Sequence, residues 1–151
     1  MSETGSPGAV VLLTRLARQV YRLSTEATLG MQLKEFATLV HLRDQRCSTQ
    51  QALGEAMCLD ANTLVLLLNS LEAAELVMRR RDPTDRRRHL VEITQLGLVA
   101  LEKAERGMES VEDEVLAGLD EGEREDLRQL LARSLEGKRD QIDTVLAAKA
   151  R

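Results

Sequence analysis

Apolar side chains recur every three or four residues along most of this 151-residue chain, and this spacing is typical of amphipathic helices. The pattern predicts helices over residues 10–28, 32–45, 61–74 and 95–119, a short helix that begins after Ser48, and a last helix that begins near Asp120. In the helix over residues 61–74, four leucines share one face that we expect to be buried, namely Leu64, Leu67, Leu68 and Leu71.

The helical spacing is interrupted between residues 76 and 94, where two β-prone runs flank a turn. Residues 76–78 lead into the turn and residues 90–94 lead out of it, with Pro83 between them. Two such runs joined by a proline-containing loop predict a β-hairpin. Helix, turn, helix, hairpin and long helix is the order of a winged helix-turn-helix protein.

Polar residues stand at several of the predicted helix starts. Ser48 and Gln51 fit a capping box, Asp60 is a good N-cap, and Thr94 is placed to cap the long helix. In the helix after Ser48 we expect four residues to be buried, namely Ala52, Leu53, Ala56 and Met57. The apolar stripes of the C-terminal helices comprise Leu98, Leu101, Met108, Val115 and Leu119, then Leu127, Leu130, Leu131 and Leu135, then Ile142, Val145 and Leu146. Gly137 would end the last helix or kink it.

The composition favours a helical core. The chain has one Phe, one Tyr and no Trp, so its core must be built from Leu, Val, Ala and Met. These residues favour packed helices over a β-sandwich. The formal net charge of −4 argues against a general polyanion-binding protein.

Positive charge is concentrated in the hairpin. Residues 79–88 hold six arginines and two aspartates, a local net charge of +4, whereas residues 102–126 carry a net charge of −8. Guanidinium groups at a hairpin tip are suited to binding the phosphates of a nucleic-acid backbone, because arginine presents a rigid fork of hydrogen-bond donors and stays protonated. A solvated, charge-rich turn is the alternative, and the pair of short helices before the hairpin favours nucleic acid.

Other classes of protein find little support in the sequence. There is no secretory signal, and no apolar stretch approaches the roughly 20 residues that a membrane helix needs, so a soluble cytoplasmic protein with no membrane partner is expected. Neither His41 nor His89 has neighbours at metal-ligand spacing. No nucleophile–base pair, phosphate-cradling loop or carboxylate dyad is evident. We therefore expect no metal, no cofactor and no enzymatic activity.

The predicted terminal helices are too long to bury their apolar stripes against one small central module. We expect residues 9–30 and 95–151 to form a helical dimerisation region in which two copies interlock about a twofold axis. Residues 31–94 are expected to form the DNA-binding region, and residues 1–8 a disordered lead. An intramolecular helical bundle is the alternative to a homodimer.

Several strings in this order resemble the MarR family of bacterial transcription regulators. They lie at residues 53–60, 71–72 and 76–77, and above all at 82–87 and 93–97. The last two read Asp-Pro-Thr-Asp-Arg-Arg and Ile-Thr-Gln-Leu-Gly. The similarity spans the whole chain, and this pattern around the hairpin is its most specific part.

The resemblance implies a mainly helical winged helix-turn-helix homodimer with a small β-hairpin wing. Such proteins bind a pseudo-palindromic operator in double-stranded DNA and usually repress transcription until a small-molecule effector, here unknown, or an oxidant releases them. The helix after Asp60, the recognition helix, would enter the major groove, and the hairpin tip would enter the adjacent minor groove. Arg87 is then the minor-groove arginine, with its guanidinium held by Asp85. Arg86 and Arg88 would contact flanking phosphates.

The recognition helix departs from the family pattern, because no Lys or Arg occurs between Arg46 and Arg79. An asparagine on its outward face could pair with adenine, and Val65 or Leu66 could pack on thymine methyl groups, so we expect an operator that leans toward A·T pairs. The candidate major-groove residues are Ala61, Asn62, Thr63, Val65, Leu66 and Asn69.

Electrostatic affinity would then depend on the wing and on residues just before the recognition helix. The candidate phosphate contacts there are Arg43, Arg46, Ser48, Thr49 and Gln50. The uncharged face around Leu66 also suits a rival function, a protein-docking adaptor that has lost strong DNA binding. The wing arginines argue against that rival, since an adaptor does not need them.

Cys58 stands where the family usually has glycine, in the turn before the recognition helix. Glycine there often reflects a left-handed backbone, which cysteine adopts at some cost. A small buried core residue is one interpretation of Cys58, and a redox-responsive thiol whose oxidation distorts the turn is the other. A bridge to Cys47 is conceivable from the sequence.

Overall fold

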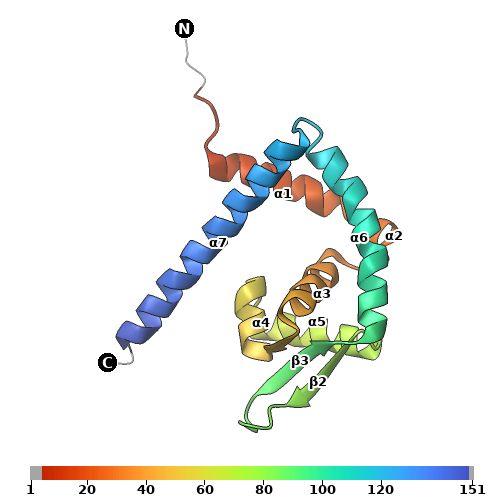
Figure 1. The fold of residues 1–151 in the computed structure, drawn as a ribbon, viewed down its shortest axis with the longest axis vertical. Coiled ribbons are helices and arrows are strands. Elements are labelled where there is room, and N and C mark those ends of the chain that lie inside the picture. The colour runs from red at the N-terminus through yellow and green to blue at the C-terminus, as the bar shows by residue number, and fades with distance from the viewer. Residues whose placement is uncertain (1–4, 150–151) are drawn as a thin grey trace. The chain divides into compact units, whose positions relative to one another are not determined.

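The computed structural model describes residues 5–149, with side chains described for residues 5–137. The chain forms two compact units, one up to Val115 and one from Leu116 onward. Figure 1 shows the order of the elements along the ribbon. They are α1 (Ala9–Leu23), α2 (Glu26–Leu29), α3 (Leu33–Gln45), β1 (Cys47–Thr49), α4 (Gln50–Met57), α5 (Ala61–Ala73), β2 (Val77–Arg81), β3 (His89–Ile93), α6 (Gln95–Val115) and α7 (Glu121–Lys149).

Leucine builds the core of the first unit. The predicted face of α5 is buried as expected, and it packs with leucines from α3, α4 and α6. The largest fully buried side chains are Leu29, Leu39, Leu42, Leu53, Leu68, Leu71, Leu101, Val91 and Thr38. The predicted class, mainly helical with a small β-hairpin, is confirmed.

The hairpin is confirmed, and it gains a third strand that the sequence did not predict. The sheet is antiparallel with the order β1-β3-β2, so β3 lies in the middle. Val77 pairs with Ile93 and Arg81 with His89 across the hairpin, while Ser48 of β1 pairs with Val91 on the other side. Three residues between two helices are too few to show an alternating pattern, which is why β1 was missed.

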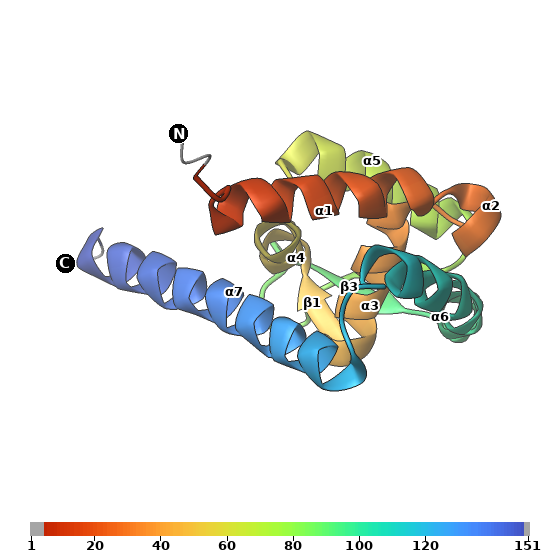
Figure 2. The same ribbon diagram turned by 90° about the horizontal axis from the view of Figure 1, so that it is seen from above.

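The predicted helix over residues 10–28 is confirmed as far as Leu23 and is wrong beyond it. Helix α1 ends at Leu23, and Thr25 then caps the single turn of α2 by accepting a hydrogen bond from the Thr28 backbone N–H at 3.2 Å. This short helix ends at Gly30, whose φ of 76° is left-handed. It packs against α6 (Figure 2). Gly107 of α6 leaves room there for the Thr28 backbone carbonyl.

The capping residue of α4 also differs from the prediction. Thr49 accepts the hydrogen bond from the Ala52 N–H at 3.1 Å, whereas Ser48 belongs to β1. Leu53 is buried as predicted and Met57 is half-buried, whereas Ala52 and Ala56 are exposed and Gly54 is buried without having been predicted. In α6 Leu98 is exposed, and the buried positions are Gly97, Leu101, Ala104 and Val111.

In the second unit, α7 begins with a reciprocal capping box between Asp120 and Glu123. Its backbone stays helical through Gly137, so the predicted end there is wrong. Leu130, Leu131 and Leu135 are exposed. The apolar positions predicted at residues 142, 145 and 146 lie outside the residues whose side chains the structure describes. Residues 1–4 of the predicted disordered lead lie outside the described backbone.

No helix in the described part of the chain is by itself long and apolar enough to span a membrane. Helices α4 and α5 meet that criterion only when they are joined across their 109° bend.

Candidate nucleic-acid interface

Helices α4 and α5 form a helix-turn-helix with an angle of 109° between them. The turn depends on Cys58, which has φ 54° and ψ 39° and donates its backbone N–H to the end of α4. The left-handed backbone predicted for Cys58 is therefore confirmed. Asp60 follows as the predicted N-cap and accepts from the Thr63 N–H at 2.9 Å. These two residues set the direction in which α5, the recognition helix, leaves the turn.

The outward face of α5 lies open to solvent. Leu66 is 70% exposed and Val65 38% exposed, and Ala61, Asn62 and Asn69 are exposed as well. Thr63 is half-buried, and its hydroxyl donates to the Asp60 carboxylate at 2.8 Å. Five of the six candidate major-groove residues thus lie on the surface, while Thr63 helps to cap the helix.

Acid should loosen the start of the recognition helix. Hydrogen bonds from the Thr63 N–H and hydroxyl lower the pKa of Asp60 below its ordinary value of 3.8. A lowered folded-state pKa means that the cap stabilises the protein above about pH 4, and that this contribution is lost as the pH falls through the lower folded value. We expect the denaturation midpoint of the wild type to fall more steeply below pH 4 than that of Asp60→Asn, which keeps a capping oxygen without a titrating group. Parallel curves for the two proteins would contradict this role.

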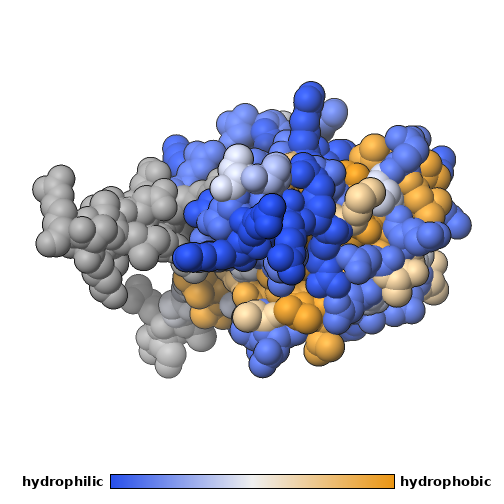
Figure 3. Space-filling view, turned by 90° about the horizontal axis from the view of Figure 1, so that it is seen from below, coloured by the Kyte–Doolittle hydropathy of each residue, from blue (hydrophilic) through white to orange (hydrophobic). Residues whose placement is uncertain are grey.

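The arginines of the wing, residues 77–93, divide into paired and unpaired groups. Three of them form ion pairs: Arg79 with Glu72, Arg80 with Glu92, and Arg88 with Asp85. Within the described residues, Arg81, Arg86 and Arg87 form no ion pair. Figure 3 looks onto this end of the molecule, where hydrophilic side chains gather over the hairpin and hydrophobic surface lies beside them.

Side chains of the turn hold the hairpin tip in shape. Asp82 accepts from the Thr84 N–H at 2.8 Å and from its hydroxyl at 2.7 Å, which lowers the pKa of Asp82. Asp85 accepts from the backbone N–H of Arg87 at 3.0 Å, and its other oxygen lies 3.6 Å from Arg88 Nε. The predicted bond from Asp85 to the Arg87 guanidinium is therefore wrong, because a two-residue spacing in a turn brings a carboxylate over the backbone N–H instead.

An unpredicted contact joins the wing to the recognition helix. Arg79 of β2 reaches α5, where its Nε donates to Glu72 Oε2 at 2.9 Å and its Nη2 donates to Asn69 Oδ1 at 2.6 Å. This arginine lowers the pKa of Glu72. A guanidinium thus lies against a helix that has no basic residue of its own. Ten residues separate Arg79 from Asn69, and only the return of the hairpin along α5 brings them together.

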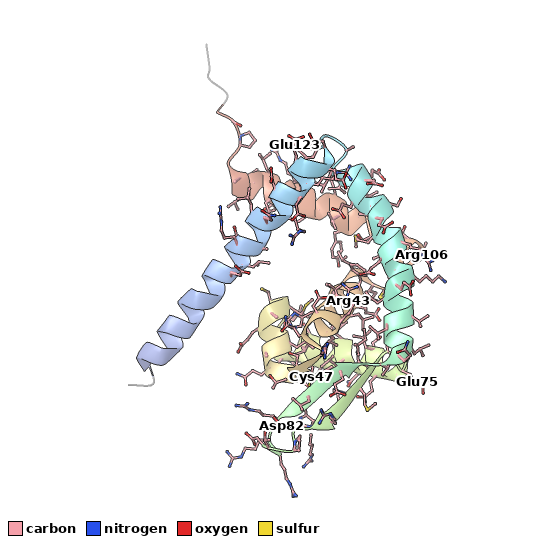
Figure 4. All side chains as sticks on the ribbon, viewed as in Figure 1. Arg43, Cys47, Glu75, Asp82, Arg106 and Glu123 are labelled. Atoms are coloured by element: carbon pink, nitrogen blue, oxygen red, sulfur yellow. The ribbon has the colours of Figure 1, made fainter. Side chains whose placement is uncertain are left out.

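The candidate phosphate contacts before the recognition helix are less available than predicted. Arg43 pairs with Glu105 of α6 and with Asp44, because it lies on the side of α3 that packs against α6 (Figure 4). These carboxylates hold the pKa of Arg43 above its usual range. Ser48 is buried and the Thr49 hydroxyl serves as a cap. Arg46 is exposed, with a φ of 62°, and Gln50 is half-buried.

Both cysteines are free and exposed, so the interpretation of Cys58 as a buried core residue is wrong. Cys58 lines a groove of about 560 Å³ between α4 and α5, together with Gln51, Glu55 and Leu59. Partial desolvation of the Cys47 thiol, more than the nearby Glu92 carboxylate, raises the pKa of Cys47, which leaves less thiolate at neutral pH. Among the residues that the structure describes, no group of three or more His, Cys, Asp or Glu could hold a metal ion.

Curated bacterial proteins are similar to this chain. A Thauera aromatica protein named for the hcr operon is 36% identical over 85 residues, which cover 56% of this chain and 51% of that protein. The HTH-type transcriptional repressor NicR of Pseudomonas putida is 32% identical over 68% of this chain and 65% of NicR. The HTH-type transcriptional regulator MhqR of Bacillus subtilis is 30% identical over 69% of this chain and 72% of MhqR. The aligned part therefore spans about half to three quarters of these relatives.

Solved structures share the fold. A crystal structure from Pseudomonas aeruginosa has 29% identity and a TM-score of 0.70, with 83% of this chain and 95% of that chain covered. A structure of Bordetella bronchiseptica BpsR, which concerns regulation of DNA binding by 6-hydroxynicotinic acid, has 25% identity and a TM-score of 0.72, with 89% and 97% covered. A cysteine mutant of E. coli MarR complexed with operator DNA has 25% identity and a TM-score of 0.70, with 83% and 92% covered.

The family model for the MarR family matches residues 31–89. This stretch holds α3, both helices of the helix-turn-helix, and the hairpin as far as the first residue of β3. The similarity to MhqR extends the match over 69% of the chain. The chain therefore belongs to the MarR family of transcriptional regulators.

Proposed function

We propose that this chain is a DNA-binding repressor that acts as a homodimer on a pseudo-palindromic operator. The observation that carries the proposal is the solvent-exposed face of α5 beside a hairpin tip with three unpaired arginines, Arg81, Arg86 and Arg87. The helix would enter the major groove, and Arg87 would enter the neighbouring minor groove. The operator-bound structure of E. coli MarR and the name of the repressor NicR support this assignment.

Exposed apolar surface on both units supports the homodimer. Helix α1 has no buried residue and exposes Val10, Val11, Leu12 and Leu13. Helix α7 exposes Leu130, Leu131 and Leu135. A second copy of the chain would cover these surfaces. In the dimer the two recognition helices would lie about 34 Å apart, so that they enter successive major grooves on one side of the DNA.

A hollow near the end of α1 supports an effector site. It has a volume of about 310 Å³ and is lined by residues that include Tyr21, Ser24 and Lys34. The buried Ser24 hydroxyl has no hydrogen-bond partner within the described residues. A small polar molecule there could favour one spacing of the recognition helices over another, which is how an effector would release DNA. The BpsR structure shows a relative of this kind regulated by a small molecule.

Equilibrium binding to the DNA upstream of the chain's own gene tests the proposal. Three unpaired arginines in each of two wings allow about six phosphate contacts, so we expect affinity to fall about a thousandfold between 50 and 200 mM salt. Sedimentation should show a dimer under the same conditions. A monomer, or a protein that binds no duplex even at low salt, would contradict the proposal and would favour a protein-docking adaptor that uses the apolar face around Leu66.

A further inference from the structure

The contact between Arg79 and the recognition helix determines what Asn69 can offer to a base. Arg79 holds Glu72 through its Nε at 2.9 Å and its Nη2 at 3.3 Å, so the guanidinium lies as a fork against the helix. The same Nη2 donates to Asn69 Oδ1 at 2.6 Å. Since a guanidinium can only donate, it must face the oxygen of the Asn69 amide. The orientation of that amide is therefore set by the protein before DNA arrives.

With Oδ1 directed at Arg79, the free side of the Asn69 amide is its NH₂ group. The side chain is exposed and lies on the same helix face as Asn62 and Leu66. An asparagine that pairs with adenine through two hydrogen bonds must accept from N6 with the same oxygen that Arg79 occupies. A positive guanidinium beside that oxygen also disfavours the approach of a second donor. The amide oxygen keeps a second lone pair, but the guanidinium beside it makes a further donor unfavourable, so the adenine pairing suggested by the sequence is disfavoured for Asn69.

We propose that Arg79 makes Asn69 a donor-only contact that selects keto bases, guanine or thymine, at one position of each half-site. Guanine presents O6 and N7 to the major groove and thymine presents O4, and all of these accept a hydrogen bond. Cytosine presents only an amino group, and adenine presents its N6 amino group beside the N7 acceptor, so each meets the Asn69 NH₂ donor with another donor where guanine and thymine present a keto oxygen. The inference rests on the proposed DNA binding, and it assigns Arg79 as a positioning residue that does not itself touch the base.

Glu72 makes this arrangement stable at physiological pH. Its carboxylate is held ionised by Arg79, which lowers its pKa, and it fixes the guanidinium through two of its donor nitrogens. Arg79 is largely covered, with 21% of its side chain exposed, while Glu72 remains 45% exposed. Because β2 packs against α5, the Arg79 guanidinium keeps its place beside Asn69.

Selection of binding sites from randomised duplexes tests the inference, with Asn69→Asp as the decisive variant. Aspartate keeps the shape of asparagine and still accepts from Arg79, but it offers a base only acceptors. We expect the wild type to enrich guanine or thymine at one position per half-site, and Asn69→Asp to shift that position about tenfold toward adenine or cytosine. Asn62→Asp is the matched control: it adds the same charge to the same face, and any change that it causes should fall at a different position.

A second variant tests the role of Arg79 directly. Arg79→Gln removes the guanidinium and frees the Asn69 amide to turn, so adenine should join guanine and thymine at the affected position. A structural role alone would lower affinity without changing which base is preferred. If the wild type enriches a defined sequence and Asn69→Asp leaves every base preference unchanged, the inference is wrong and the proposed function stands. If the wild type binds no duplex at all, both fail together.

Discussion

Replacing Arg87 with alanine is expected to weaken duplex binding about a hundredfold or more. Arg87 lies at the hairpin tip, and within the described residues it has no carboxylate partner that would compete with DNA. The loss of one groove-inserted arginine is worth about tenfold or more, and a dimer loses two. Titration of labelled duplex at several salt concentrations should also show a shallower dependence of affinity on salt, because fewer counterions are released.

Arg106→Ala is the matched control for this change. Figure 4 places Arg106 on α6, well away from the hairpin tip marked by Asp82, and its side chain is exposed. The variant removes the same charge from the same chain, so its affinity for duplex DNA should stay close to that of the wild type. Equal losses in Arg87→Ala and Arg106→Ala would mean that net charge, and not the wing, controls binding.

Gly97→Ala is expected to lower the free energy of unfolding by about 1–3 kcal/mol, the usual cost of overpacking. A Cβ atom at this position would lie 2.2 Å from the Leu76 carbonyl oxygen and 2.7 Å from Ile93 Cγ1. The carbonyl cannot easily move away, because it accepts the Thr94 backbone N–H at 3.0 Å. The start of α6 would therefore have to separate from the hairpin, which chemical denaturation would report as a lower midpoint.

Gly137→Ala provides the opposite case within the same chain. Gly137 also lies inside a helix, but a Cβ atom there would meet nothing within 4 Å. Alanine should therefore raise the free energy of unfolding by about 0.5–1 kcal/mol, through helix propensity alone. An unchanged midpoint for Gly97→Ala would show that the contact between α6 and the hairpin is looser than the structure indicates.

The parts of the fold that local patterns control were predictable from the sequence. The leucine face of α5, its Asp60 cap and the two strands of the hairpin all lie where periodicity and turn residues placed them. The left-handed backbone at Cys58 was predicted from the family resemblance, because the family usually has glycine at this turn. Each of these features depends on residues that are close together in the sequence.

The features that were missed depend on contacts between distant segments. Helix α1 breaks at Ser24 although the apolar spacing continues, because α2 turns to pack against α6 at Gly107. Strand β1 exists because β3 pairs with it. Likewise, Arg43 forms an ion pair with Glu105, which lies 62 residues later in the sequence, and no local pattern reveals such a contact. A pattern of apolar residues shows that a surface is covered but not which segment covers it.

The ion pairs of Arg79, Arg80 and Arg88 have a consequence for how such a protein would search a chromosome. With half of the hairpin's cations already matched by carboxylates, the attraction to random sequence is weaker than six arginines would produce. A regulator must leave millions of competing sites quickly to reach its own. Because carboxylates of the protein neutralise these arginines, each binding event at a random DNA sequence should be short. Discrimination between sites is then left to the side chains that touch bases.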